Sequence, residues 1–270
     1  MPSVIVVTGA SSGVGLAAAE QFAARGDEVV LVGRNPQRLA AAVERVKAAG
    51  NGREPARHQA DFERLDDVRA LAESLLSAYP RIDVLANNAG GMVASYRRTA
   101  DGYESTVQGN HLAPFLLTEL LHERLRGGRV VNTASEAHRG SKVDPDDLTG
   151  APERYSGFPV YGSSKAANIL FTAEAARRWP DILSVSFHPG VVRSNFGDGA
   201  LVRLFYRYAP FLVSADKAGA LLVWLATVPA SELVNGGYYV GHKLKQPAPA
   251  AADQQLAARL WEASEQAVGV

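Results

Sequence analysis

Short apolar runs alternate with longer amphipathic stretches along this chain, and the alternation limits the folds it can adopt. Several runs rich in Val, Ile and Leu have the length of buried strands: Val4–Val7, Val29–Val32, Ile82–Ala86, Val130–Asn132 and Leu183–Phe187. Strands that are apolar on both faces are typical of a parallel sheet covered by helices. Residues around 55–60 and Gly237–Val240 can add two more strands, so we expect about seven.

Helical segments are expected between and after these strands, at about residues 14–25, 36–49, 64–79, 101–126, 160–179 and 252–267. The segment at 36–49 has Asn35 as its expected N-cap, Pro36 at the first helical position and Gly50-Asn51-Gly52 at its end. This order predicts an α/β fold, a Rossmann-type doubly wound parallel sheet with helices on both faces. No linker or change of composition divides the 270 residues, so we expect a single domain.

Composition excludes several kinds of site and partner. The chain has no cysteine, which rules out disulfides, thiolate metal sites and a cysteine nucleophile. Its six histidines show no metal-ligand spacing, and its formal net charge of zero does not indicate nucleic acid as a partner. The longest apolar run, Ala218–Ala230, is shorter than the roughly 20 residues of a membrane span, so it predicts a buried helix. Without a signal peptide or span, a cytoplasmic location is expected.

A glycine-rich turn, T-G-A-S-S-G-V-G at 8–15, follows the first expected strand and leads directly into a helix. Glycines at such a turn let the main chain approach a pyrophosphate, and the helix N-terminus offers its N–H groups to the anion. The spacing G-x-x-x-G-x-G differs from the G-x-G-x-x-G dinucleotide fingerprint. The position between strand and helix nevertheless favours nucleotide binding.

The end of the second expected strand indicates which dinucleotide is bound. NAD enzymes tend to place an acidic residue there, whereas this chain has Gly33-Arg34. A planar guanidinium suits a 2′-phosphate, so NADP(H) is favoured over NAD(H). Asp61, after the third strand, could bind adenine or cap a helix. Asn87-Asn88-Ala89-Gly90, after the fourth strand, could line the ligand site or form a simple turn.

Tyr161 and Lys165 are four residues apart, which places them on one helix face with Cβ atoms roughly 5–6 Å apart. A free phenol has a pKa of about 10, and a nearby ammonium lowers that pKa by favouring the phenolate. The pair could therefore move a proton near neutral pH. Ser135 with His138 or His188 could instead suggest a hydrolase, but no G-x-S-x-G elbow accompanies the serine.

Taken together, these features resemble the short-chain dehydrogenase/reductase family over nearly the whole chain. The motifs that carry the resemblance are T-G-A-S-S-G-V-G at 8–15, N-N-A-G at 87–90, Asn110, Ser135, Tyr161 with Lys165, and Pro189-Gly190. The chain is similar in particular to the retinol dehydrogenase-like branch, through residues 110–118, 161–172 and 188–193. The wide separation of Ser135 and Tyr161 also resembles that branch and implies an extra loop at about 138–158.

The resemblance implies a role for each of these residues. Tyr161 would be the general acid/base, and Lys165 would lower its pKa and bind the nicotinamide ribose. Ser135 would polarise the substrate oxygen, and Asn110 would bend its helix and fix a water that links Lys165 to solvent. The implied cofactor-binding residues are Gly9, Ser11, Ser12, Gly13, Val14, Gly15, Arg34, Asp61, Phe62, Asn87, Ala89, Gly90, Tyr161, Lys165, Pro189, Gly190, Val192 and Ser194.

These roles predict an NADP-dependent oxidoreductase that interconverts a carbonyl and an alcohol by hydride transfer. Residues 1–100 would mainly bind the cofactor, 101–195 would form the catalytic half and 196–216 a substrate lid, with 252–267 as the C-terminal helix. The lid's apolar content suggests a lipophilic small-molecule substrate, although its side chains could instead pack on the core. The family commonly forms dimers or tetramers. Two alternatives are a C=C reductase on the same fold and a non-catalytic NADP-binding sensor.

Overall fold

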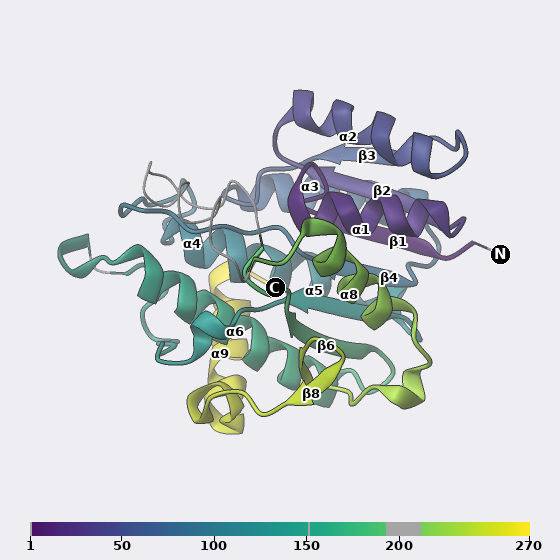
Figure 1. Ribbon diagram of the computed structural model, residues 1–270. Helices are drawn as coiled ribbons and strands as arrows, with labels where there is room; N and C mark the ends of the chain where they lie inside the picture. The colour runs from purple at the N-terminus through teal and green to yellow at the C-terminus, as the bar shows by residue number, and fades with distance from the viewer. Residues whose placement is uncertain (1, 151, 193–211) are drawn as a thin grey trace.

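The structure is a computed structural model that describes residues 2–150, 152–192 and 212–270. Within these residues a single sheet runs in the order β3-β2-β1-β4-β5-β6-β7-β8, and most of this order can be followed from top to bottom in Figure 1. The strands are β1 (Val4–Thr8), β2 (Glu28–Gly33), β3 (Ala56–Gln59), β4 (Val84–Asn87), β5 (Arg129–Thr133), β6 (Leu183–His188), β7 (Tyr238–Val240) and β8 (Lys243–Lys245).

Strand β1 lies at the point where the chain reverses its direction of travel across the sheet. From β1 the chain adds β2 and β3 on one side, then returns to add β4 to β7 on the other, and all of these neighbours pair in parallel. Val6 pairs with Val30 of β2 and with Leu85 of β4. Ligands of doubly wound sheets bind in the crevice at the carboxyl end of such a reversal. The topology therefore points to the ends of β1 and β4.

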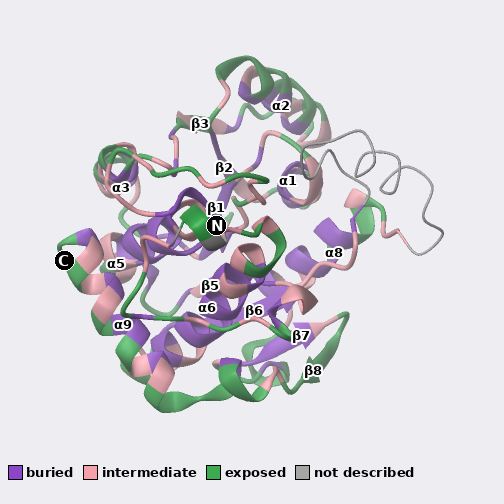
Figure 2. Ribbon diagram, turned by 90° about the vertical axis from the view of Figure 1, so that its left-hand side faces the viewer, coloured by how far each residue is buried: buried purple, intermediate pink, exposed green. Residues whose placement is uncertain are grey.

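Helices cover both faces of the sheet. On one face the buried cluster joins the strands to α1 (Gly13–Ala24), α2 (Pro36–Ala49) and α8 (Ala215–Thr227). On the other face it joins them to α3 (Leu65–Ala78), α5 (Ala113–Leu125), α6 (Gly157–Arg178) and α9 (Gln254–Val268). Figure 2 shows buried residues along the strands and on the inner faces of these helices.

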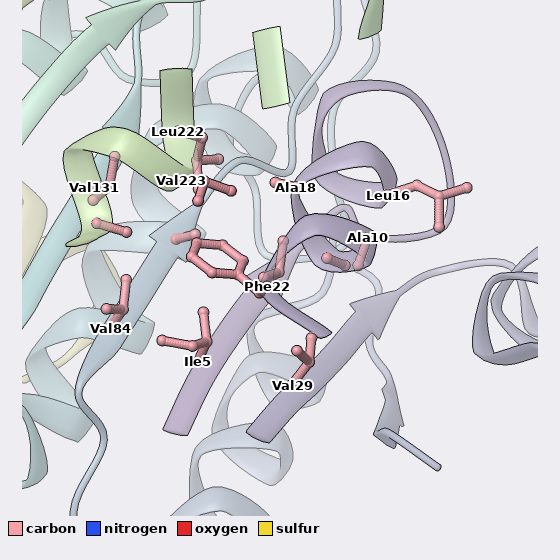
Figure 3. Close-up of a cluster of buried hydrophobic side chains, with 14 of the residues drawn as sticks. Ile5, Ala10, Leu16, Ala18, Phe22, Val29, Val84, Val131, Leu222 and Val223 are labelled. Carbon is pink, nitrogen blue, oxygen red and sulfur yellow. The ribbon is translucent and has the colours of Figure 1, made fainter. Parts of the chain in front are cut away.

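The two clusters explain why the strands are apolar on both sides. Ile5 and Val7 face the first cluster, while Val6 between them faces the second. Figure 3 shows the ring of Phe22, from α1, lying near Ile5 with Leu222 beside it. Burying side chains of this size on both faces stabilises the fold by roughly 1.5–3 kcal/mol each. The α/β doubly wound fold predicted from the sequence is confirmed.

The sheet has eight strands rather than the expected seven or so. Strand β8 pairs antiparallel with β7 after a two-residue turn in which Gly241 has φ 58°. All three residues of β8 are exposed, as Figure 2 shows at the edge of the sheet. An exposed Lys-Leu-Lys edge strand has no apolar run to mark it, and lysines on such an edge discourage pairing with other chains.

The helix expected at 101–126 begins later and is irregular. Gly102 has φ 95°, and Glu104 caps the helix because its Oε2 accepts from Val107 N at 2.8 Å. A short α4 (Ser105–Val107) then leads into a π-helical segment, Gln108–Leu112, before α5. A π segment widens the helix locally and is frequent at functional sites.

Other helix predictions agree closely with the structure. Asn35 caps α2, since its Oδ1 accepts from Arg38 N at 2.9 Å. The buried helix expected from the Ala218–Ala230 run is α8. Within the described ranges, no helix has the length and apolar character needed to cross a membrane.

Candidate active site

The turn between β1 and α1 is held so tightly that only glycine fits at two of its positions. Gly9 has φ +65°, and a Cβ added there would lie 2.9 Å from Ala89 Cα. A Cβ added to Gly15 would lie 2.5 Å from Asn88 Nδ2. Ser12 caps α1 without a side-chain hydrogen bond, and the first turn of α1 has no acidic residue. The N–H groups at this helix end are therefore left for an anion.

Thr8 and Asn88 fasten this turn to the end of β4. The Thr8 hydroxyl donates to Ala86 O at 3.1 Å and accepts from Asn88 N and Ala89 N at 3.0 and 2.9 Å. The Asn88 amide donates to Thr8 O at 3.0 Å. Asn87 was expected at the cofactor; no sequence signal marked the side chains of Thr8 and Asn88.

Asn87 itself points into the protein. Its Nδ2 donates to Thr118 Oγ1 at 3.0 Å and to Asn132 Oδ1 at 2.9 Å, and the residue is buried. Its Oδ1 is buried and has no hydrogen-bond partner within the described residues. The expectation that Asn87 lies along the adenosine ribose stays a prediction.

Gly90, Asn110 and Lys165 come together from three distant parts of the chain. A Cβ added to Gly90 would lie 2.7 Å from Asn110 Oδ1 and 3.3 Å from Lys165 Nζ. Asn110, in the π segment, accepts from Gly91 N and donates to Gly91 O, both at 2.9 Å. Its Nδ2 also donates to Ser164 Oγ at 2.9 Å. These bonds hold the segment after β4 against α6.

Lys165 is buried beside the ring of Tyr161. Its Nζ lies 5.5 Å from the Tyr161 ring centroid and donates to Thr133 O at 3.0 Å. The residue is only 3% exposed, and burial lowers the pKa of its ammonium to about 8. The amine next to this phenol can thus change charge close to neutral pH.

Ser135 begins the short 3-10 turn Glu136–His138 just after β5, and its Oγ accepts from Ala137 N at 3.2 Å. His138 Nδ1 lies 2.7 Å from Ser135 O and must donate to it, while its Nε2 accepts from Ala248 N at 3.0 Å. Both ring nitrogens are therefore engaged with main-chain groups. Because His188 Nδ1 accepts from Glu136 N at 3.3 Å, neither histidine activates the Ser135 hydroxyl through these contacts.

Arg34 follows β2 and is bonded to carboxylates that follow β3. Its Nη1 lies 3.2 Å from Glu63 Oε1 and 3.7 Å from Asp61 Oδ1. Asp61 accepts from Glu63 N at 3.1 Å and does not cap α3, whose N-cap is Arg64. Phe62, between them, is buried in the core beneath. Arg34 itself remains 61% exposed and can reach a ligand at this edge of the sheet.

The remaining expected residues follow β6. Gly190 has φ +89°, and a Cβ added there would lie 2.6 Å from Val213 Cγ2. Val192 forms a parallel bridge with Val213, which brings this segment next to the start of α8. Pro189 precedes Gly190 in the same turn. Ser194 and residues 196–211 of the expected lid lie outside the described residues.

The glycine turn, the Asn110–Lys165 cluster and Ser135 thus lie at the carboxyl ends of neighbouring strands. Residues 3–200 match the family model for short chain dehydrogenases. The chain belongs to this family. As a short chain dehydrogenase it is an oxidoreductase, and the family resemblance expected from its motifs is confirmed.

Known short chain dehydrogenases resemble it along nearly all of its length. A Streptomyces sp. (strain C5) protein, provisionally named a daunorubicin C-13 ketoreductase, is 52% identical over 265 residues, covering 98% of this chain and 92% of that protein. Human retinol dehydrogenase 12 is 34% identical over 274 residues, covering 99% and 86%. A solved short chain dehydrogenase from Burkholderia cenocepacia J2315, in complex with NADP, has a TM-score of 0.71 at 27% identity and covers 93% of this chain and 98% of that one.

Proposed function

We propose that this short chain dehydrogenase interconverts a ketone and an alcohol with NADP(H), using Tyr161 as general acid/base. The observation that carries the proposal is the placement of the buried Lys165 amine, between the Tyr161 ring and the Gly90–Asn110 contact at the reversal of the sheet. The ketoreductase name of the relative that is 52% identical supports a ketone over an aldehyde.

The residues present fit a dinucleotide. Gly13 has φ +56° and open space at its Cβ position. The start of α1, where the Ser12 side chain makes no capping hydrogen bond, can bind the charge of a pyrophosphate. When bound, the nicotinamide supplies or accepts the hydride. The residues proposed to hold the cofactor are Gly9, Ser11, Ser12, Gly13, Val14, Gly15, Arg34, Asp61, Phe62, Asn87, Ala89, Gly90, Tyr161, Lys165, Pro189, Gly190 and Val192.

Proton transfer then follows from three side chains. Tyr161 donates its proton to the substrate oxygen during reduction and accepts it back during oxidation. Ser135 donates a second hydrogen bond to that oxygen, because its Oγ already accepts from Ala137 N and its own proton is left to point elsewhere. The ammonium of Lys165 favours the phenolate that Tyr161 leaves behind.

Asn110 would position its neighbours and would not react itself. Its amide already bonds Gly91 and Ser164, so a water linking Lys165 to solvent would have to be held by the Asn110 main chain. Its side chain keeps the Gly90 turn closed against Lys165. Asn110 makes these contacts from the π segment that directly precedes α5.

The function is tested with purified protein, NADPH and a panel of ketones that includes daunorubicin, following the absorbance of the reduced nicotinamide. Deuteride transferred from labelled NADPH should be found on the carbinol carbon of the product. Label on a carbon of a former C=C bond would support the double-bond reductase instead. Cofactor binding without turnover of any ketone, aldehyde or alcohol would support the sensor.

For cofactor preference, replacing Arg34 with Ala should weaken NADPH binding roughly tenfold or more, since a charge-assisted hydrogen bond contributes about 1.5–3 kcal/mol. NADH affinity should change little, because it lacks the 2′-phosphate. Fluorescence titration of both cofactors measures the two effects. Arg45→Ala is a matched control, since Arg45 is equally exposed but bonds Glu20 on α1. Equal losses for both cofactors would contradict the assignment.

An exposed aromatic side chain supports an apolar substrate. Phe158, in the first turn of α6, is 63% exposed. Residues at i, i+3 and i+7 share one helix face, so Phe158 lies on the face that carries Tyr161 and Lys165. It stands one turn from Tyr161 toward the open end of the helix, where the body of a substrate bound at the Tyr161 hydroxyl would extend.

Two close contacts lie on either side of this face of α6. A Cβ added to Gly157 would lie 2.5 Å from Val93 O, and one added to Gly162 would lie 2.5 Å from Ala137 O. The segment after β4 thus packs closely against α6 at Gly157, and the turn after Ser135 packs closely against it at Gly162. By helical spacing, Phe158 lies on the face between these two contacts.

We expect Phe158→Ala to raise KM for aromatic ketones about two- to tenfold, because a stacked aromatic pair contributes about 0.5–1.5 kcal/mol. Kinetics with small aliphatic ketones should change little, and Phe158→Tyr should restore KM. Steady-state assays on both ketone classes measure this. Leu244→Ala, at an exposed apolar residue of β8, is the control. A KM that rises equally for aliphatic ketones would contradict stacking.

A further inference from the structure

Two arginines from distant segments bind the same carboxylate oxygen at the proposed adenosine end of the site. Glu63 Oε1 accepts from Arg34 Nη1 at 3.2 Å and from Arg97 Nη2 at 2.6 Å. Arg34 follows β2, Glu63 follows β3, and Arg97 belongs to the segment between β4 and α4. Of the three, only Arg34 follows an expected strand in a way that marks it in the sequence.

Arg97 is held in place by more than this ion pair. Its Nη2 also donates to Ser105 Oγ at 3.1 Å, and its main-chain oxygen accepts from Ser105 N at 2.9 Å. These contacts fix the Arg97 side chain from the start of α4. Both guanidinium groups remain about half exposed or more, at 61% for Arg34 and 53% for Arg97, so a ligand can reach them.

Two planar guanidinium groups around one oxygen match the way proteins bind phosphate oxygens. A phosphomonoester carries a charge of about −1.5 to −2 at neutral pH, which one arginine neutralises only in part. We propose that Arg97 is a second specificity-determining residue for the 2′-phosphate of NADP(H). The Glu63 carboxylate occupies the phosphate position in the cofactor-free protein and moves aside when the phosphate binds. This inference rests on the proposed NADP(H) dependence.

Glu63 thereby competes with the 2′-phosphate for the guanidinium groups of Arg34 and Arg97. Its carboxylate and that of Asp61 offset the charges of Arg34 and Arg97 when no cofactor is present. Part of the phosphate's binding energy is spent on displacing Glu63, whose side chain is 24% exposed and can turn toward water. NADH lacks the 2′-phosphate that would displace Glu63. The Glu63–Arg97 ion pair therefore remains formed, and Arg97 adds nothing to NADH binding.

The test is a titration of NADPH, NADH and adenosine 2′,5′-bisphosphate against wild type and three single variants. Arg97→Ala should weaken NADPH and the bisphosphate about tenfold and leave NADH unchanged. Glu63→Gln should tighten NADPH severalfold, again without effect on NADH. Arg98→Ala is the matched control, because the neighbouring Arg98 donates to Gly102 O at 2.6 Å and should affect neither cofactor.

Other outcomes separate this inference from the proposed cofactor preference. A wild type that binds NADPH and NADH equally overturns the NADP(H) preference itself. If wild type prefers NADPH and Arg34→Ala removes that preference, an unchanged Arg97→Ala overturns the role of Arg97 alone. Arg97→Ala that weakens NADPH and NADH equally shows a merely structural role and also overturns it. A Glu63→Gln variant that binds NADPH more weakly overturns the displacement.

Discussion

Replacing Tyr161 with Phe is expected to lower turnover about 10²- to 10⁴-fold, the range that a positioned general acid contributes. Phe keeps the ring that lies 5.5 Å from Lys165 Nζ and removes only the hydroxyl that would donate the proton. NADPH affinity should therefore survive the change. Single-turnover kinetics with a ketone substrate and fluorescence titration of NADPH measure the two quantities separately.

A matched control uses a tyrosine whose hydroxyl makes a hydrogen bond outside the candidate site. The Tyr103 hydroxyl donates to Ala267 O at 2.8 Å, far along the chain from the site residues, so Tyr103→Phe should keep its turnover. Near-normal turnover by Tyr161→Phe would remove Tyr161 from the proposed role. Loss of both turnover and NADPH binding would mean instead that the phenol positions the cofactor.

The fold could be predicted because the elements that determine it carry a strong pattern. Strand β1 is apolar at every position from Val4 to Val7, since Val6 meets one core and its neighbours meet the other. Strand β8 has no such pattern, because it is paired on one edge and exposed throughout. The π segment contains Asn110, the residue expected to bend this helix, but the later start of the helix depends on a contact between distant residues. The bond between Asp101 and Leu65 N that accompanies the bend at Gly102 joins residues far apart in sequence.

Motifs indicated which residues gather at the candidate site, but not which way each side chain points. Asn87 and Asn88 are adjacent amides, and neighbouring residues at a strand end point to opposite sides. Sequence alone could not tell that Asn87 turns inward to Thr118 while Asn88 holds the glycine turn. Neither Arg97 nor Glu63 belongs to a motif, and only the folded chain brings them to Arg34.

Replacing Lys165 with Met is expected to remove most activity and yet stabilise the cofactor-free protein at pH 7. Turnover should fall about a hundredfold or more, because Tyr161 loses the charge that favours its phenolate. Stability should rise because the ammonium is buried and its pKa is lowered from 10.5 to about 8. That shift corresponds to a cost of about 3 kcal/mol in the free energy of unfolding at pH values below both pKa values.

The sign of the pH dependence distinguishes this cause from simple packing. Between pH 8 and 10.5 the unfolded chain binds more protons at Lys165 than the folded chain, so the stability of wild type rises with pH across this range. The advantage of Lys165→Met should thus be largest at pH 7 and shrink as pH rises toward 10.5. Thr133 O loses one donor in the variant but keeps Asn168 Nδ2 at 3.2 Å, so little of the gain is lost there.

Urea unfolding of the cofactor-free protein at several pH values between 7 and 10.5 measures the effect, with Lys217→Met, at an exposed residue of α8, as the control. A variant less stable than wild type at pH 7, or a stability difference that does not change with pH, would show that burying the Lys165 ammonium does not destabilise the protein. A stable but inactive variant would mean that the protein keeps an unfavourable buried charge because its chemistry needs one. Stability is commonly given up in this way at sites of catalysis, and here a single amine would account for both the cost and the activity.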